Sequence, residues 1–154
     1  MQDRWVWSKC EFSVASARRL IDDQRMPYVS TKTRWVTVVS IKVNVHAWKV
    51  KIDRLPTRIN ISRRGMDIDS ILCLSCNAAV ESVSHVFFSC HIARDVFRLI
   101  SNWWDYDYIE LSLYEDWFVW LLNLRISSNH KKLIKGVCFI SWWYRTKASF
   151  SWVD

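Results

Sequence analysis

Four side chains that commonly bind metal fall within eighteen residues near the middle of the chain. Cys73 and Cys76 are separated by two residues, His85 follows after eight more, and Cys90 after another four. Three thiolates and one imidazole make the ligand set of a closed, tetrahedral structural zinc site. The first two cysteines suit a tight turn, and His85 and Cys90 lie near one turn of a helix. The pattern C-x2-C-x8-H-x4-C therefore predicts one Zn²⁺ that ties two short elements together.

Other interpretations of these residues stay open at this point. Cysteine is often a small buried hydrophobic residue, and His85 beside an apolar run also suits a core histidine. His91 adjoins Cys90 and is an alternative ligand, although it follows the apolar run. An enzyme with Cys73 or Cys76 as nucleophile and His85 as base is a further alternative. We favour a structural metal, because four protein ligands leave no open coordination position for a substrate.

Composition limits the class of protein. The chain has 154 residues, enough for a core, and only two glycines and two prolines, which favours helices with short connections. No apolar run approaches the roughly 20 residues of a membrane span, and the N-terminus lacks a signal-peptide pattern. Five cysteines, three of them in the metal pattern, suit a reducing compartment, with Cys10 and Cys138 as free thiols. We expect an intracellular protein of the nucleus or cytoplasm, with no membrane partner.

The first third of the chain gives weaker signals. Residues 3–7 form an aromatic run that suits a short strand or an arm. Ser13 can cap a helix over residues 14–23, and residues 24–33 are expected to form a loop.

Residues 41–52 fit two patterns at once. Their apolar residues alternate with polar ones as in a strand, yet a helical face can also be formed by Ile41, Val45, Trp48, Ile52 and Leu55. Periodicity alone does not decide between them. Thr57 then suits the cap of a short helix, and Gly65 suits the left-handed residue beyond its end.

Three amphipathic helices are predicted after the metal pattern. Over residues 91–104, an apolar stripe is formed by Ile92, Val96, Leu99, Ile100 and Trp103. A capping-box pair, Ser112 and Glu115, opens the next helix, whose face is formed by Leu113, Trp117, Trp120, Leu121 and Leu124. After a turn at residues 127–129, the helix over residues 131–150 is expected to face inward through Leu133, Val137, Ile140 and Tyr144, broadened by Trp142 and Trp143. The stripe positions place Trp103, Trp117 and Trp120 in the core.

Several separate motifs, all in the same order, carry a family resemblance. They are Lys42-Val43-Asn44-Val45-His46-Ala47-Trp48-Lys49, Arg54-Leu55-Pro56-Thr57-Arg58-Ile59-Asn60, Arg63-Arg64-Gly65-Met66, Cys73-x2-Cys76, Glu81-Ser82, Ser84-His85-Val86-Phe87-Phe88, Cys90 and Ala93-Arg94-Asp95-Val96-Phe97. Together they resemble the reverse transcriptase zinc-binding domain of plant non-LTR (LINE-type) retrotransposons. The resemblance covers about residues 5–104, and residues 111–152 resemble a tail found downstream of this domain.

The resemblance implies the ligand set Cys73, Cys76, His85 and Cys90, and it favours a helix over residues 41–54. It also implies a zinc-binding domain over residues 1–104, with a helical tail over residues 105–154 packing on it as one structural unit. We therefore expect a mainly α fold, a small helical domain with one structural zinc site of the CCHC type. The chain departs from the family pattern at several positions, among them Leu74, where the family often has proline, and Asn77, where it often has glycine.

Basic residues concentrate just before the metal pattern. Residues 42–64 carry one acid, Asp53, and seven basic residues, a net charge of +6 within the chain's +7: Lys42, Lys49, Lys51, Arg54, Arg58, Arg63 and Arg64. These residues are candidates for binding the backbone of RNA or of a primer–template duplex. The alternative is the solvated face of two amphipathic helices. His91, Arg94 and Arg98 are candidates for extending the basic surface.

No catalytic motif accompanies these features. The acids Asp105, Asp107, Glu110, Glu115 and Asp116 are more typical of a charged loop and a helix start than of a two-metal site. We interpret the chain as a non-catalytic module that binds RNA or DNA next to the polymerase of a retrotransposon polyprotein. The alternatives are a protein–protein interaction module that binds other segments of the polyprotein, or a relic fragment without retained activity.

Overall fold

The computed structural model describes residues 35–149, which belong to one compact unit that begins at Thr33. The elements predicted over residues 3–7, 14–23 and 24–33, and the thiol of Cys10, lie outside the described residues. The unit includes residues on both sides of position 104, and the domain boundary that we place there stays a prediction.

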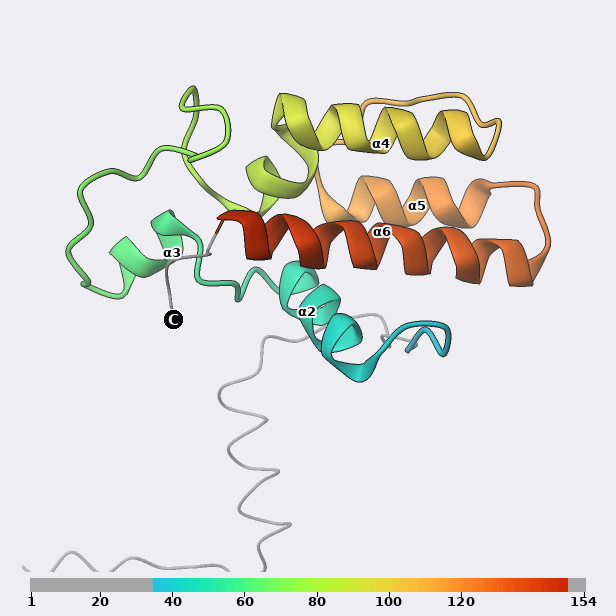
Figure 1. Ribbon diagram of the computed structural model, residues 1–154, viewed down its shortest axis with the longest axis horizontal. Helices are drawn as coiled ribbons and strands as arrows, with labels where there is room; N and C mark the ends of the chain where they lie inside the picture. The colour runs from blue at the N-terminus through green and yellow to red at the C-terminus, as the bar shows by residue number, and fades with distance from the viewer. Residues whose placement is uncertain (1–34, 150–154) are drawn as a thin grey trace, which may run out of the picture. The chain divides into compact units, whose positions relative to one another are not determined.

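The described part of the chain is mainly helical, as predicted. Its elements in order are α2 (Ile41–Lys51), α3 (Arg58–Arg63), the π-helical turn η1 (His85–Ser89), α4 (His91–Trp103), α5 (Tyr114–Asn123) and α6 (Ser128–Ser149). Residues 35–149 contain no β-strand, only one isolated antiparallel bridge between Leu72 and Val80. The long helix α6 lies at the centre: α2 crosses beneath it, and α4 and α5 lie above it (Figure 1). No helix within residues 35–149 is both long and apolar enough to cross a membrane.

The segment with two competing patterns is a helix, α2. Its buried residues include Val43, Ala47 and Val50, which follow the i, i+4, i+7 spacing and pack into the core. The helical face suggested by the sequence is rotated away from the buried one: Ile41 is 75% exposed and Val45 and Trp48 are half-buried, although Leu55 beyond the helix is buried. The side-chain amide of Asn44 explains the rotation: its Oδ1 accepts from the amide of Val36 at 2.8 Å, and its Nδ2 donates to the same residue's carbonyl at 3.0 Å. This pairing turns the Asn44 side of the helix inward, towards the preceding loop.

An aromatic core joins α5 to α6. Trp117 is 1% exposed, and its ring centroid lies 4.8 Å from that of Trp142 and 5.9 Å from that of Phe139. The prediction that Trp117 and Trp120 belong to the core is confirmed. Such ring pairs add directional contacts to the large apolar area that they bury.

The inward face predicted for α6 was correct only in part: Trp142 is buried, and Val137 and Trp143 pack against the core. Leu133, Ile140 and Tyr144 are exposed, and the other buried positions are Ile134, Gly136, Cys138 and Phe139. The helix packs against both α2 and α5, so two neighbours define its buried surface, and a single apolar stripe does not describe it. Gly136 marks a close approach, because a Cβ atom there would lie 3.0 Å from Cγ2 of Val38.

The stripe predicted for α4 also differs from the buried face. Ala93, Ile100 and Ser101 are buried, whereas Leu99 is 67% and Trp103 is 75% exposed. Trp103 was therefore wrongly assigned to the core. Ala93 packs against Cys73 and Cys90, a contact that the apolar pattern alone did not indicate.

Helix ends follow local hydrogen bonding. Gly65 has a φ of +79°, as predicted. Ser127 Oγ accepts from the amide of His130 at 3.3 Å, and α6 begins at Ser128, inside the stretch that was predicted as a turn. The capping residues of α5 are shifted by one position from the predicted pair, since Asp116 Oδ2 accepts from the amide of Leu113 at 3.0 Å. Cys138 is a buried free thiol, as predicted.

Candidate metal centre

The first two cysteines lie on a tight loop, here called the knuckle (residues 72–80). The amide of Cys73 donates to the carbonyl of Ala79 at 2.8 Å, and the amide of Asn77 donates to the carbonyl of Cys73 at 2.7 Å. Asn77 has a φ of +51°, in the left-handed region that glycine adopts most easily and asparagine tolerates. These bonds close the loop so that both sulfurs point to the same side.

The second ligand pair is positioned by the π-helical turn η1. The amide of Cys90 donates to the carbonyl of His85 at 2.8 Å, a bond that spans five residues instead of four. In an α-helix, residues five apart point in clearly different directions, whereas the wider π turn brings them to nearly the same side. The four residues between His85 and Cys90 therefore fit a π turn.

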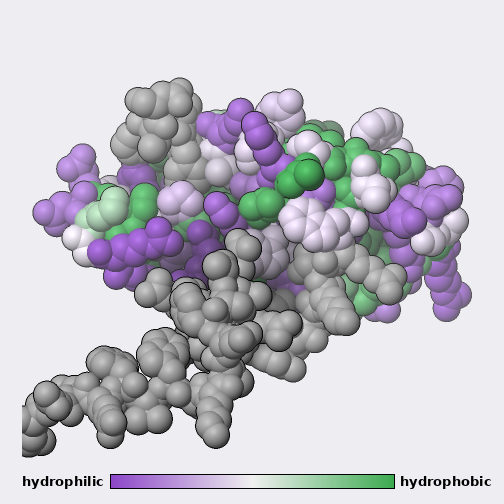
Figure 2. All heavy atoms as spheres, turned by 90° about the horizontal axis from the view of Figure 1, so that it is seen from below, coloured by the Kyte–Doolittle hydropathy of each residue, from purple (hydrophilic) through white to green (hydrophobic). Residues whose placement is uncertain are grey.

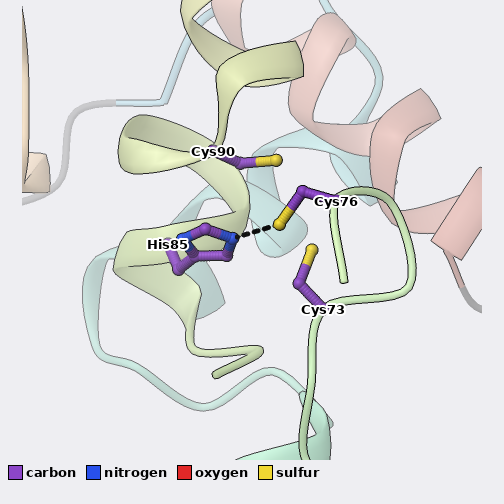
Figure 3. A group of neighbouring side chains, drawn as sticks. All are labelled: Cys73, Cys76, His85 and Cys90. Atoms are coloured by element: carbon purple, nitrogen blue, oxygen red, sulfur yellow. Dashed lines mark hydrogen bonds between the residues drawn. The ribbon is translucent and has the colours of Figure 1, made fainter. Parts of the chain in front are cut away.

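The knuckle and η1 bring the four predicted ligands together (Figure 3). One ligand atom from each of Cys73, Cys76, His85 and Cys90 lies within 4.8 Å of every other. Cys76 Sγ and His85 Nε2 lie 3.1 Å apart. Zinc bonds to sulfur and imidazole nitrogen at their usual lengths hold tetrahedral ligand atoms roughly 3.5–3.8 Å apart. Small side-chain movements are enough to accommodate the ion.

A family model described as zinc-binding in reverse transcriptase matches residues 12–97, more than half of the chain. The chain belongs to this family. All four clustered donors lie within the matched residues. No curated protein and no solved structure matches the chain.

The donor set of this zinc-binding domain is chemically suited to its metal. Burial, followed by the positive charge of Arg145, lowers the pKa of His85 and favours the neutral imidazole that binds metal. The backbone amide of Ala78 makes the largest contribution to lowering the pKa of Cys76, whereas burial raises the pKa of Cys73. Thiolates and a neutral imidazole prefer Zn²⁺ over the hard cations Mg²⁺ and Ca²⁺.

One residue that supports the centre was not recognised as such in the sequence. Glu81 is only 1% exposed, and its carboxylate accepts from the amide of Arg58 at 3.2 Å and from the amide of Leu74 at 3.4 Å. It thereby caps α3, while Thr57 makes no capping bond through its side chain. Leu74 lies between the first two cysteines, so Glu81 connects α3 directly to the knuckle. The sequence signal was a single acid inside the metal pattern, between Cys76 and His85.

The predicted basic residues divide into two groups. Lys42, Lys49, Arg54, Arg63 and Arg64 are exposed. Arg58 is different: its Nη1 donates to the carbonyl of Ser70 at 3.0 Å and its Nε lies 4.0 Å from Glu81. Arg58 therefore fixes the segment before the knuckle. Lys51 is partly buried, and burial lowers its pKa.

Two of the three further candidates for a basic surface, Arg94 and Arg98, are engaged elsewhere. Arg94 pairs with Glu110, and Arg98 pairs with Asp95 at 2.8 Å and lies 4.9 Å from the ring centroid of Tyr108. His91 is exposed and does not contribute to the four-residue cluster.

The acids after α4 form no metal site. Within residues 35–149, the only group of three or more potential metal-binding side chains is the Cys3His cluster. The family match is to a zinc-binding domain and not to a polymerase.

Proposed function

We propose that this chain is a non-catalytic module of, or derived from, a retrotransposon reverse transcriptase, and that it binds RNA or DNA beside the polymerase. It holds one structural Zn²⁺ through Cys73, Cys76, His85 and Cys90. The plant, LINE-type origin rests on the order of the sequence motifs around these ligands. The observation that carries nucleic-acid binding is the exposed basic group Arg54, Arg63 and Arg64 on the segment joined to the knuckle by Glu81.

Electrostatics supports this assignment. Hydrophilic side chains are exposed at the end of the molecule that carries α3, as they are at the opposite end (Figures 1 and 2), and those of Arg63 and Arg64 are among the exposed ones. When exposed cationic side chains bind phosphates, the counterions condensed on the nucleic acid are released. This release favours binding and makes the affinity strongly dependent on salt concentration. Arg63 and Arg64 lie at the C-terminal end of α3, where their positive charge interacts favourably with the negative end of the helix dipole.

Zinc has a structural role in this proposal. When bound, it cross-links the knuckle to η1 and leaves no open coordination position. Since Glu81 and Arg58 connect the knuckle to α3, a closed knuckle also fixes the position of the basic residues. We therefore expect metal removal to weaken nucleic-acid binding.

Charge reversal tests this function. We expect the double variant Arg63→Glu/Arg64→Glu to bind single-stranded RNA more weakly, and the slope of log affinity against log salt to become shallower by about 1.5. Fluorescence anisotropy at several salt concentrations measures both quantities. The double variant Arg125→Glu/Lys132→Glu makes the same charge change at exposed positions outside the basic stretch. Equal losses in the two double variants, or unchanged salt slopes, would contradict a specific surface on α2 and α3.

A further inference from the structure

A pocket lies between α4 and α6, and none of the proposed nucleic-acid-binding residues of α2 and α3 lines it. Its volume is about 490 Å³, and apolar side chains from several elements line it, among them Ile92, Val96, Phe88, Trp142 and Tyr144. The two helices on its sides do not pack closely against each other, whereas α5 packs on α6 and α4 packs on η1. The pocket is therefore an opening between helices that are supported by other neighbours.

The apolar lining continues along α4 beyond the pocket. Ile92, Val96, Leu99 and Trp103 follow the i, i+4, i+7, i+11 spacing, so they form one stripe about 16 Å long. Ile92 and Val96 line the pocket, while Leu99 and Trp103 remain mostly exposed. A stripe of this kind normally buries itself against another element, and nothing within residues 35–149 covers its outer part. Its length exceeds that of a small ligand and suits three turns of a helix.

Two arginines place positive charge in this apolar setting. Nε and Nη2 of Arg145 and Nε of Arg94 are inaccessible to solvent and have no hydrogen-bond partner among residues 35–149. Both residues line the pocket, and Arg94 also pairs with Glu110. Buried donors without partners are costly, and a guanidinium is best satisfied by the two oxygens of a carboxylate. Arg145 as a whole is only half-buried and lines the pocket, so a small rotation of its guanidinium brings these donors to an acid that enters the pocket.

We propose that the groove between α4 and α6 binds an amphipathic helix of a partner protein. The helix lays large apolar side chains along Ile92, Val96, Leu99 and Trp103, and it presents a carboxylate to Arg145. Apolar lining disfavours a phosphate backbone, which exposed cations bind better. The net charge of +7 disfavours a second copy of the chain. This surface is separate from the proposed nucleic-acid surface and does not depend on it.

Peptide selection tests the groove without assuming a partner. A phage-displayed library of random 16-residue peptides is selected against the zinc-loaded full chain. We expect the enriched peptides to share apolar residues at i, i+4 and i+7 together with an aspartate or glutamate. A synthetic peptide with the enriched sequence should bind at least about tenfold more weakly to Arg145→Gln. It should lose binding to Val96→Asp and bind normally to Lys132→Gln, a matched change at an exposed position of α6.

A double-variant comparison identifies the charge contact. Replacing the peptide's acid with its amide should weaken binding to the unchanged chain, and it should cause no further loss with Arg145→Gln. Zinc content and far-ultraviolet circular dichroism establish that each variant is folded, and Arg145→Lys, which keeps the charge, should recover part of the affinity. The proposal is overturned if no peptide is enriched, if enriched peptides lack an acid, or if Arg145→Gln has no effect. It is also overturned if sedimentation shows a dimer of the chain that Val96→Asp dissociates.

Discussion

Residues 57–82 and the helix pair α5 and α6 bury very different kinds of side chain. In residues 57–82 the buried side chains are Thr57, Asn60, Cys73 and Glu81, and none is aliphatic or aromatic. In α5 and α6 the buried side chains are mostly large and apolar, with Trp117 and Phe139 each 1% exposed. The first region is held by directed bonds, such as Asn60 Nδ2 to the carbonyl of Leu55 at 3.0 Å, and the second by packed rings.

This difference in buried side chains shows that a structural metal can replace an apolar core as the source of stability. Polar contacts contribute little net free energy each, and they require their partners to be fixed in advance. A zinc ion can fix the knuckle where the chain supplies no apolar core, because its binding free energy becomes folding free energy. The aromatic region needs no such cross-link. The two regions should therefore respond differently to metal removal, to cavity formation, to pH and to backbone strain.

Removal of zinc should have the largest effect, and it should be confined to the knuckle side. We expect Cys76→Ser to lose zinc and to destabilise this region by several kcal/mol, while α5 and α6 stay helical. Hydrogen exchange measured with and without chelator locates the change. Cys138→Ala is the matched control, since this buried cysteine lies in the aromatic core and should leave zinc content unchanged. Equal exchange rates over residues 57–90 with and without chelator would contradict the claim that this region depends on zinc.

A cavity in the aromatic core should destabilise α5 and α6 and leave zinc binding intact. We expect Trp117→Ala to lower the free energy of unfolding by about 3–5 kcal/mol, because it empties the space between Phe139 and Trp142. Urea unfolding followed by circular dichroism measures this loss. Trp103→Ala, at an exposed position, should change stability by less than about 0.5 kcal/mol. A loss of zinc by Trp117→Ala under conditions where the chain remains folded would show that the two regions are not independent.

Acid should weaken the contact between α2 and α6 through His46. Thr146 donates its hydroxyl to the carbonyl of Trp142 at 3.0 Å, so it accepts from His46 Nε2 at 2.7 Å, and Nδ1 has no partner within residues 35–149. Burial, followed by the charge of Lys49, lowers the pKa of His46 to about 4. The unfolded chain takes up this proton first as pH falls, so stability is full above pH 6.5 and is lost towards pH 4.

The matched variant for this titration is His46→Phe, which keeps an aromatic ring at the same position. We expect it to lack about 3 kcal/mol of the acid destabilisation seen in the unchanged chain between pH 6.5 and 4. Urea unfolding at several pH values measures the difference, and zinc release affects both proteins alike. Parallel stability curves for the two proteins would rule out His46 as the source.

Backbone strain at the knuckle should give the smallest effect. Asn77 has a φ of +51°, where glycine meets less steric cost. We expect Asn77→Gly to increase zinc affinity by about twofold to threefold, equivalent to about 0.5 kcal/mol, and Asn77→Ala to decrease it. Competition with a chromophoric chelator measures these affinities. An increase with alanine equal to that with glycine would exclude backbone strain as the cause.

The candidate ligand set and the helical class could be predicted because both depend on local information. The spacing of Cys73, Cys76, His85 and Cys90 limits which side chains can meet one ion, and the family motifs favoured a helix where alternation suggested a strand. The buried faces of α4 and α6 could not be predicted in the same way. These helices carry apolar residues on more than one side, so periodicity did not choose among them.

The sequence by itself determined the spacing of the four metal-binding residues, the helical class, and the left-handed residue at Gly65, because each depends on a few neighbouring residues. Only the tertiary structure decided that His85 and Cys90 share a π turn, that Glu81 connects α3 to the knuckle, and that Trp103 faces outward. Packing decided these features, since the free energy of each side chain depends on neighbours that are distant in the sequence. A stripe that the sequence predicts to be buried, Ile92 to Trp103, is consequently left as the wall of an open groove.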